Sequence, residues 1–275
     1  MKKFTAIALV IAMLACFCGC VAPAENELNL NNPGKLMVAI SPDFAPMEFV
    51  DTEGNFVGFD IMLAEYIAES LGLELELIPM SFEACQTAVS MGSVDMAISG
   101  FSWLPEREAN YNLSDFYHAG ENEENQVLIQ LASGETKYSS AESLSGLKVG
   151  AQGASLQESL CKDQLSGSEI VPVSDLNTAL LQLQNGDFSA LAVAEGNADA
   201  IIANNPQFEK TGFYFDVDEK YTDNLILIQK GNDALTEAVN NALAESEQYW
   251  NDWYAEALNI AGVDVSYDDE GNIIG

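Results

Sequence analysis

Residues 99–107 of the chain read S-G-F-S-W-L-P-E-R and end on the only arginine of the 275-residue sequence, Arg107. The apolar run from Val94 to Ile98 comes directly before this stretch and predicts a short buried strand. Pro105 suits the first position of a helix, where its missing N–H group costs nothing. The sequence therefore predicts a strand that leads into this stretch and a helix whose first turn carries Arg107.

Arg107 is one cation in a chain with 43 aspartate and glutamate residues and a formal net charge of −33. A guanidinium binds a carboxylate through two parallel charge-assisted hydrogen bonds, each contributing about 1.5–3 kcal/mol. Arg107 is therefore a candidate for binding an anionic group. The stretch alone is equally compatible with a surface ion pair to Glu106 or Glu108.

The acidic composition limits the possible partners. Few cations are present to neutralise phosphates, which argues against nucleic acid and against docking on an anionic membrane surface. His118 is the sole histidine and no H-E-x-x-H motif occurs, so neither a metal site nor a cofactor is expected. Beyond the N-terminal segment the cysteines are Cys85 and Cys161, which we expect to be buried free thiols, although an exported protein could also pair them.

The N-terminal segment predicts export. Lys2 and Lys3 precede an apolar core, residues 4–14, that is too short to span a bilayer. The cysteines that follow resemble those of bacterial lipoprotein signals, in which one cysteine becomes the lipidated first residue of the mature chain. Cys20 is the first candidate, which makes residues 1–20 the expected signal peptide, and Cys16 is the alternative.

Residues 21–34 are polar and aperiodic and are expected to be a tether. No second apolar run is long enough to cross a membrane, so the membrane is expected to be contacted only through the lipid, on the extracellular face of the cell membrane. A plain secretory cleavage near Ala22 or Ala24 is the other possibility, and it would make the protein secreted or periplasmic.

The order of the remaining elements predicts an α/β fold with two similar units. The first unit is expected to contain strands at 35–40, 73–78 and 94–98, a hairpin over 48–59, a helix from Asp60 as N-cap to Leu71, and a helix over 81–91. The second is expected to contain strands at 147–151, 170–173 and 189–194, a helix that starts with a capping box at 155–158, and a helix capped by Ser174. Polar crossings near 120–126 and 216–224 separate the units, and a strand at 225–228 and a helix over 232–258 follow.

Five strings, in this order, resemble family 3 of the extracellular solute-binding proteins, which serve polar-amino-acid ABC transporters. The resemblance extends from about residue 35 to residue 258, nearly the whole mature chain. Each string alone is weak evidence, whereas their common order is strong. The strings are K-L-M-V-A-I-S-P-D-F-A-P-M-E-F from Lys35, G-N-F-V-G-F-D-I-M-L-A-E-Y-I-A from Gly54, G-S-V-D-M-A-I-S-G-F-S from Gly92 with P-E-R shortly after it, L-S-D-F-Y from Leu113, and L-S-G-L-K-V-G-A-Q-G from Leu144.

The resemblance implies a type II periplasmic-binding-protein-like clamp, in which two lobes close on a free amino acid by a hinge motion. Each lobe would be a mostly parallel sheet flanked by helices, with two crossover strands. Lobe 1 would comprise residues 35–126 and 219–275, and lobe 2 residues 127–218. The resemblance also implies a monomer without a cofactor that delivers its amino acid to the membrane permease of an ABC transporter.

The resemblance assigns the α-carboxylate of the ligand to Arg107, with donors from Ser102 and from the loop formed by Gly153, Ala154 and Ser155. A helix N-terminus with free N–H groups is an anion site on physical grounds as well, which agrees with this position. The other contacts that the resemblance implies are aromatic walls from Phe44 and Phe82, backbone carbonyls at Ser99 and Gly100 for the ammonium group, and Ser41 near the side chain of the ligand.

One position departs from the family pattern. After the strand that ends near Val193 the family usually has an aspartate that pairs with the ammonium group of the ligand, and Ala194 stands there instead. Glu195 could serve after a shift of one residue, but successive side chains along a strand point to opposite faces. The group that binds the amine is therefore open at this point.

Two other functions fit the same fold. An enzyme would need an acid or base in the cleft, and the cleft segments offer only Glu48 and Glu195, so catalysis is not expected. The ligand-sensing part of a receptor would need a spanning helix or a signalling domain, and none is recognisable in the sequence. Such a sensor could still act through a partner receptor.

Overall fold

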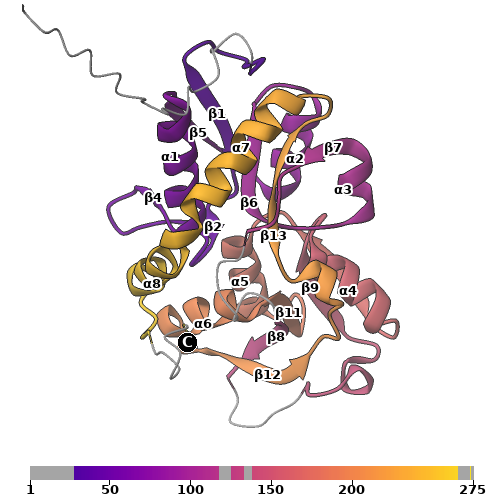
Figure 1. Cartoon of the computed structure of the whole chain (residues 1–275). Helices are drawn as coiled ribbons and strands as arrows, with labels where there is room; N and C mark the ends of the chain where they lie inside the picture. Colours follow the sequence, from indigo (N-terminus) through magenta and orange to yellow (C-terminus); the bar gives the residue numbers. More distant parts are fainter. Residues whose placement is uncertain (1–27, 118–124, 133–137, 266–272, 274–275) are drawn as a thin grey trace, which may run out of the picture.

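The computed structural model describes residues 28–117, 125–132, 138–265 and 273, which form two α/β lobes, one above the other in Figure 1. Each lobe is built on a five-stranded sheet. The strand order is β5-β1-β6-β13-β7 in lobe 1 and β10-β9-β11-β8-β12 in lobe 2. The predicted α/β fold with two units is therefore confirmed.

Lobe 1 combines parallel and antiparallel pairing. Strand β1 pairs in parallel with β5 and β6, whereas β13 runs antiparallel to β6 and β7. A separate small sheet, β2-β3-β4, contains the predicted hairpin. The strands are β1 (Lys35–Ile40), β2 (Asp43–Phe44), β3 (Glu48–Val50), β4 (Phe56–Val57), β5 (Glu74–Pro79), β6 (Met96–Ser102), β7 (Tyr111–Leu113) and β13 (Asn224–Gln229). The helices are α1 (Phe59–Leu71), α2 (Phe82–Ser90), α3 (Pro105–Asn110), α7 (Asp233–Ser246), η5 (Glu247–Tyr249) and α8 (Trp250–Ile260).

Lobe 2 repeats the arrangement. Strand β9 pairs in parallel with β10 and β11, and β8 runs antiparallel to β11 and β12. Its strands are β8 (Gln126–Leu131), β9 (Lys148–Gln152), β10 (Glu169–Val173), β11 (Ala190–Ala194) and β12 (Phe208–Tyr214). Its helices are η3 (Ala141–Leu144), α4 (Leu156–Gln164), α5 (Leu176–Asn185) and α6 (Glu195–Asn204), and η4 (Glu219–Tyr221) lies in the returning segment.

The chain enters lobe 2 between β7 and β8, and it returns between β12 and β13, which inserts between β6 and β7. The proposed lobe boundaries at 126/127 and 218/219 lie beside these crossings, except that Gln126 is already the first residue of β8. Trp103 stacks on Tyr221 of the returning segment, with 6.0 Å between the ring centroids. The next residue, Leu104, is buried in the apolar cluster of lobe 2 although it follows a strand of lobe 1.

The start of α1 is fixed by the hairpin that precedes it. The N–H groups of Phe59 and Asp60 donate to the carbonyls of Pro46 and Met47 at 3.1 and 2.8 Å. Gly58 precedes the helix with a φ of 123°, and a Cβ atom on it would lie 2.3 Å from the Met47 carbonyl oxygen. The prediction that Asp60 caps this helix is wrong, because the backbone of the hairpin takes up the first N–H groups and the Asp60 carboxylate is buried.

Two further helix predictions need correction. Asp175, not Ser174, caps α5, because the Asp175 side chain accepts from the N–H of Thr178 at 2.8 Å. The predicted helix over 232–258 is interrupted between α7 and α8 by η5. At this break the indole N–H of Trp250 donates to the Ser246 hydroxyl at 2.9 Å, and serines favour such local bonds over regular helix.

Residues 28–34, expected to belong to the tether, pack on lobe 1 instead. Leu28 is 1% exposed in the apolar cluster of lobe 1, and its carbonyl accepts from the Asn232 side chain at 2.9 Å. The backbone N–H of Asn31 donates to the Asp95 carboxylate at 2.7 Å. The expected signal peptide, Cys20 and residues 21–27 lie outside the described residues.

Cys85 and Cys161 are buried free thiols, as predicted. Burial raises the pKa of Cys161 to about 12, so it carries no thiolate at neutral pH. In the described part of the chain we find no helix whose length and hydropathy would let it cross a membrane, and no cluster of histidine, cysteine and acidic side chains arranged to hold a metal ion.

Candidate ligand-binding site

A small cavity lies between the lobes, where β6 and β9 end. It contains about 290 Å³ of space that no protein atom fills, part of it open to solvent. Six of the predicted site residues line it, together with three residues of lobe 2 that the sequence analysis missed. The lining residues are Phe44, Phe82, Ser99, Gly100, Ser102 and Arg107 from lobe 1 and Gln152, Leu156 and Gln157 from lobe 2.

A larger groove, with about 1200 Å³ of unfilled space, runs between the hairpin of lobe 1 and helices α5 and α6 of lobe 2. Its lining contains no lysine or arginine side chain and none of the predicted site residues. The smaller cavity, which holds a buried cation, is therefore the better candidate for an anionic group.

Arg107 reaches the cavity from the first turn of α3, which begins at Pro105 as predicted. The side chain is 1% exposed, and its guanidinium donates to the backbone carbonyls of Ser102 and, at 2.8 Å, Ala154. A longer bond of 3.4 Å runs from Nε to the Gln86 amide oxygen. Because Ala154 belongs to lobe 2, Arg107 joins the two lobes.

The surroundings of Arg107 are apolar apart from these oxygens. Its guanidinium lies over the rings of Phe82 and Phe101, 5.5 and 5.1 Å from their centroids. No aspartate or glutamate of the described residues forms an ion pair with it. Burial lowers the pKa of Arg107 to about 10, and the Glu106 charge acts in the opposite direction, so the group remains charged at neutral pH without an ion-pair partner in the described part of the chain. A buried cation of this kind favours an incoming anion.

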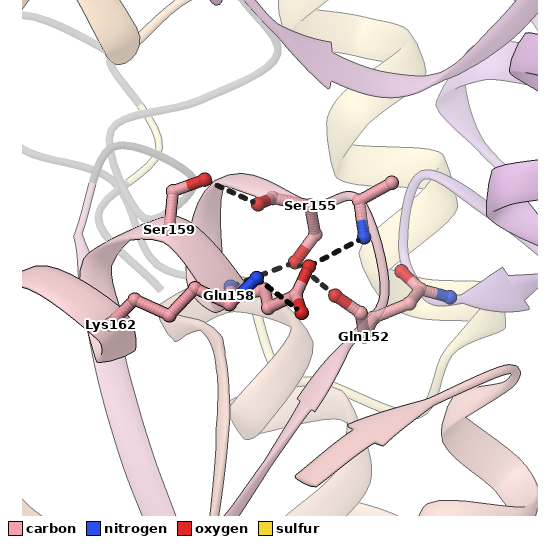
Figure 2. Close-up of polar contacts among 6 residues, drawn as sticks. Gln152, Ser155, Glu158, Ser159 and Lys162 are labelled. Atoms are coloured by element: carbon pink, nitrogen blue, oxygen red, sulfur yellow. Dashed lines mark hydrogen bonds and ion pairs between the residues drawn. The ribbon is translucent and has the colours of Figure 1, made fainter. Parts of the chain in front are cut away.

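The first turn of α4 lines the cavity from lobe 2, and Figure 2 shows the polar contacts at its start. Ser155 is its N-cap: the hydroxyl accepts from the N–H of Glu158 at 3.1 Å and donates to the Gln152 carbonyl at 2.6 Å. The Glu158 carboxylate accepts from the N–H of Ala154 at 2.9 Å, one residue before the position that a capping box predicts. The serine cap is thus confirmed and its reciprocal partner is shifted by one residue.

These bonds change which donors an anion would meet. The N–H groups of Gly153, Ala154 and Ser155, the expected donors, are all bonded to protein oxygens. The next two N–H groups, of Leu156 and Gln157, form no hydrogen bond within the described residues, and both residues line the cavity. The start of α4 therefore remains a candidate anion site. The available donors are the N–H groups of its first two residues, Leu156 and Gln157, instead of those of the preceding loop.

Ser99 and Gly100 form the floor of the cavity. The Ser99 hydroxyl accepts from the N–H of Ser41 at 3.1 Å and donates to the Glu48 carboxyl. Gly100 has a φ of 54°, and a Cβ atom there would lie 2.8 Å from the Phe44 ring, so only glycine fits between floor and wall. Ser41 itself does not line the cavity, because its hydroxyl donates to Asp43 at 3.0 Å.

Glu48 and Asp60 form a buried acid pair directly behind this floor. Both are 0% exposed, and Asp60 accepts from the N–H of Gly100 and the hydroxyl of Tyr117, each at 2.8 Å. Burial raises the pKa of Asp60 to about 6, and burial together with the Asp60 charge raises the pKa of Glu48 well above its ordinary value. Glu48 Oε2 is buried and has no donor among the described residues. A proton on Glu48 therefore removes the repulsion between two buried negative charges.

Replacing Glu48 by glutamine is expected to flatten the pH dependence of the unfolding free energy between about pH 4 and pH 7. Ordinary carboxyl groups titrate near pH 4, so in this range the folded pair holds protons that the unfolded chain has released. The wild-type free energy of unfolding therefore falls as pH rises through about 6, by about 1–3 kcal/mol from this pair. Glutamine still donates to Asp60 and accepts from Ser99 without titrating.

The measurement is urea unfolding of both proteins at closely spaced pH values. Glu48→Leu serves as the comparison, and it is expected to lose about 2 kcal/mol or more at every pH because Ser99 and Asp60 lose a partner. A Glu48→Gln protein whose stability falls with pH as steeply as that of the wild type would contradict the assignment of the proton to this pair.

Glu195 is not brought to the cavity. Its carboxylate accepts from Lys210 at 2.9 Å, Tyr214 at 2.7 Å and Asn125 at 2.9 Å, and these bonds lower its pKa although its burial acts in the opposite direction. The structure therefore does not support Glu195 as the partner of a ligand amine. The strand ends at Ala194 and Glu195 begins α6, where the three donors hold its carboxylate.

Further hydrogen bonds hold the lobes together beside the cavity. Asp43 of lobe 1 accepts from the N–H of Leu176, at the start of α5, at 2.6 Å and from the Gln152 amide at 3.3 Å. Burial raises the pKa of Asp43, and these donors act in the opposite direction. The Asn197 amide of lobe 2 donates to the Ala45 carbonyl at 2.8 Å. The two walls of the cavity are thus held against each other by direct contacts.

Comparison with known proteins gives a consistent result. Residues 36–256 match the family model of bacterial extracellular solute-binding proteins, family 3. A probable histidine-binding protein of Campylobacter jejuni is 27% identical over 85% of this chain and 93% of the relative, and the arginine-binding extracellular protein ArtP of Bacillus subtilis is 27% identical over 90% and 93%.

Among solved structures, the amino acid ABC transporter substrate-binding protein AbpA of Streptococcus pneumoniae, bound to L-arginine, superposes with a TM-score of 0.76. It is 32% identical, and the match covers 84% of this chain and 97% of that chain. The predicted two-lobe, type II architecture with helix-flanked sheets is confirmed by this likeness.

Proposed function

Because this chain belongs to family 3 of the bacterial extracellular solute-binding proteins, we propose that it captures a free amino acid between its lobes and delivers it to the permease of an ABC transporter. The observation that carries the proposal is Arg107, a guanidinium with 1% exposure and no carboxylate partner among the described residues. The α-carboxylate common to all amino acids supplies the missing counter-charge.

The geometry around Arg107 supports a two-lobe grip on that carboxylate. The guanidinium belongs to lobe 1, and the unbonded N–H groups of Leu156 and Gln157 belong to lobe 2. A carboxylate between them accepts from both lobes, and only a ligand that contacts both lobes stabilises their closed arrangement. Phe44 and Phe82 line the same cavity and are the proposed walls for the apolar part of the ligand.

The charges around the cavity bear on which amino acid fits. The acid pair lies behind the floor, Asp43 lies at the lobe contact, and the net charge of the chain is −33. This environment disfavours a ligand with an anionic side chain and favours neutral or cationic amino acids. The relatives described as histidine-binding and arginine-binding make these two amino acids the first probes.

The family and the relatives are solute-binding proteins rather than enzymes, and they are extracellular or periplasmic. We further propose that this chain works as a monomer at the extracellular face of the cell membrane, held there through a lipid on Cys20. The proposal rests on the N-terminal sequence: a basic start, a short apolar core and a cysteine after Gly19.

The test is a thermal unfolding series with purified protein and each of the common amino acids. A ligand at about 100 times its dissociation constant adds about 2.7 kcal/mol to the unfolding free energy, which corresponds to about 5–10 °C for a protein of this size. We expect a shift of this order with L-arginine, L-histidine or a similar amino acid. No shift with any of them would overturn the proposal.

A further inference from the structure

The part of the cavity that lobe 2 contributes beside Leu156 is made of amide side chains. Gln157, in the first turn of α4, donates from its side-chain nitrogen to the side-chain oxygen of Gln126 at 2.7 Å. Gln126 is 4% exposed and lies opposite Ala194 in the ladder between β8 and β11. The hydrogen bond to Gln126 thus places the Gln157 amide near Ala194, the last residue of β11.

No carboxylate lines this cavity among the described residues. Glu195 does not line the cavity, and its carboxylate forms an ion pair with Lys210. Glu48 and Asp60 are fully buried behind the floor, and Asp43 accepts from the start of α5. A ligand amine in this cavity therefore has only neutral oxygen acceptors within reach.

The hydrogen bond between the two glutamines determines which side-chain atom of Gln157 is available to bind a ligand. The partner atom on Gln126 is an oxygen, so Gln157 must use its nitrogen as the donor, and its amide oxygen is the group left to accept. No described residue donates to that oxygen. The amine and the carboxylate of an amino acid are attached to one carbon, so the group that holds the amine must line the same cavity as Arg107, and Gln157 does.

We propose that Gln157, oriented by Gln126, accepts a hydrogen bond from the α-amino group of the ligand and so distinguishes amino acids from carboxylic acids that lack the amine. The inference rests on the proposed function, since it names the group that completes the same site. It makes Gln157 a specificity-determining residue whose acceptor is an uncharged amide instead of a carboxylate.

The test compares each amino acid with the acid that lacks only its amine: L-arginine with 5-guanidinopentanoate, and L-histidine with 3-(imidazol-4-yl)propanoate. Calorimetric titration of the wild type is expected to show about tenfold or greater weakening for the acid without the amine, the loss that one hydrogen bond predicts. Gln157→Met, of similar shape, is expected to bind both members of a pair within about threefold of each other.

Gln164→Met is the matched control, because Gln164 ends the same helix but bonds to the backbone of Asp216 away from the cavity. It is expected to keep the full wild-type discrimination. Gln126→Met is the second variant; it leaves Gln157 in place without its anchor and is expected to lose part of the discrimination. Thermal unfolding of each variant without ligand checks that the lobes remain folded.

A Gln157→Met protein that still prefers the amino acid by the wild-type factor would overturn this inference and leave the proposed function standing. Equal loss in Gln164→Met would overturn it as well, since the effect would then come from the helix and not from the amide in the cavity. Failure of the wild type to bind L-arginine, L-histidine or any other amino acid overturns the proposed function and this inference with it.

Discussion

Replacing Arg107 by methionine is expected to weaken amino-acid binding at least about 100-fold, because two charge-assisted hydrogen bonds of about 1.5–3 kcal/mol each are lost. The protein itself is expected to remain folded. Methionine is unbranched and fits against Phe82 and Phe101. The loss of the three hydrogen bonds of Arg107 is offset by the removal of a buried cation that has no ion-pair partner among the described residues.

Calorimetric titration measures the loss of affinity, and two further variants serve as comparisons. Arg107→Lys keeps the charge but not the planar fork, and it is expected to recover only part of the affinity. Lys162→Met removes an exposed cation from α4 that pairs with Glu158, and it is expected to bind as the wild type does. Wild-type affinity in Arg107→Met would show that the carboxylate is held elsewhere.

Replacing Gly58 by alanine is expected to cost about 3 kcal/mol or more of unfolding free energy. The φ of 123° is one that only glycine adopts without strain, and the added Cβ atom would lie 2.3 Å from the Met47 carbonyl oxygen and 2.7 Å from the Pro46 carbonyl oxygen. Both contacts are with backbone, so no side-chain rotation relieves them. The hairpin would have to move away from the start of α1, which it caps.

Gly54→Ala is the matched control in the same hairpin. Gly54 also has a positive φ, 90°, but a Cβ atom there meets nothing within 4 Å, so only the backbone strain of about 1–2 kcal/mol is expected. Urea unfolding of the two variants and the wild type separates the cost of backbone strain from the cost of the steric clash at Gly58. Equal losses at the two glycines would refute the close packing of the hairpin against α1.

Much of the fold could be predicted because its signals are local. The strand over Lys35–Ile40 and the helix start at Pro105 follow from an apolar run and from a residue whose ring fixes φ. Ser155 caps α4 because its hydroxyl oxygen, one position before the helix, accepts from a backbone N–H group of the first turn. In each case the deciding interaction lies within a few residues of the chain.

The errors arise where a distant segment decides. Asp60 is of a residue type that often caps helices, but its carboxylate accepts from Gly100 and Tyr117 in the core. The backbone of the hairpin bonds the first N–H groups of the helix instead. Nothing near Ala194 in the sequence shows that Glu195 would meet Lys210 or that the cavity would be lined by amides.

The donors at the start of α4 show the same limit. The motif identified the right helix, but which N–H groups stay unbonded depends on Glu158 turning back to Ala154. Gln152 and Gln157 could have been found from one signal that the sequence does contain. They stand at the carboxyl end of a parallel strand and in the first turn of the helix after it, where α/β sheets place their ligands.

If Arg107 binds the ligand as proposed, Leu104 is expected to influence the affinity from outside the cavity. This residue is buried in the apolar cluster of lobe 2, and Arg107 follows three residues later on the short helix α3. Repacking of that cluster, for example at Leu128 or Phe215, is therefore expected to shift the position of the guanidinium. Grafting the cavity residues alone onto a related scaffold would consequently transfer the recognition chemistry without its affinity, because the support for the arginine would stay behind.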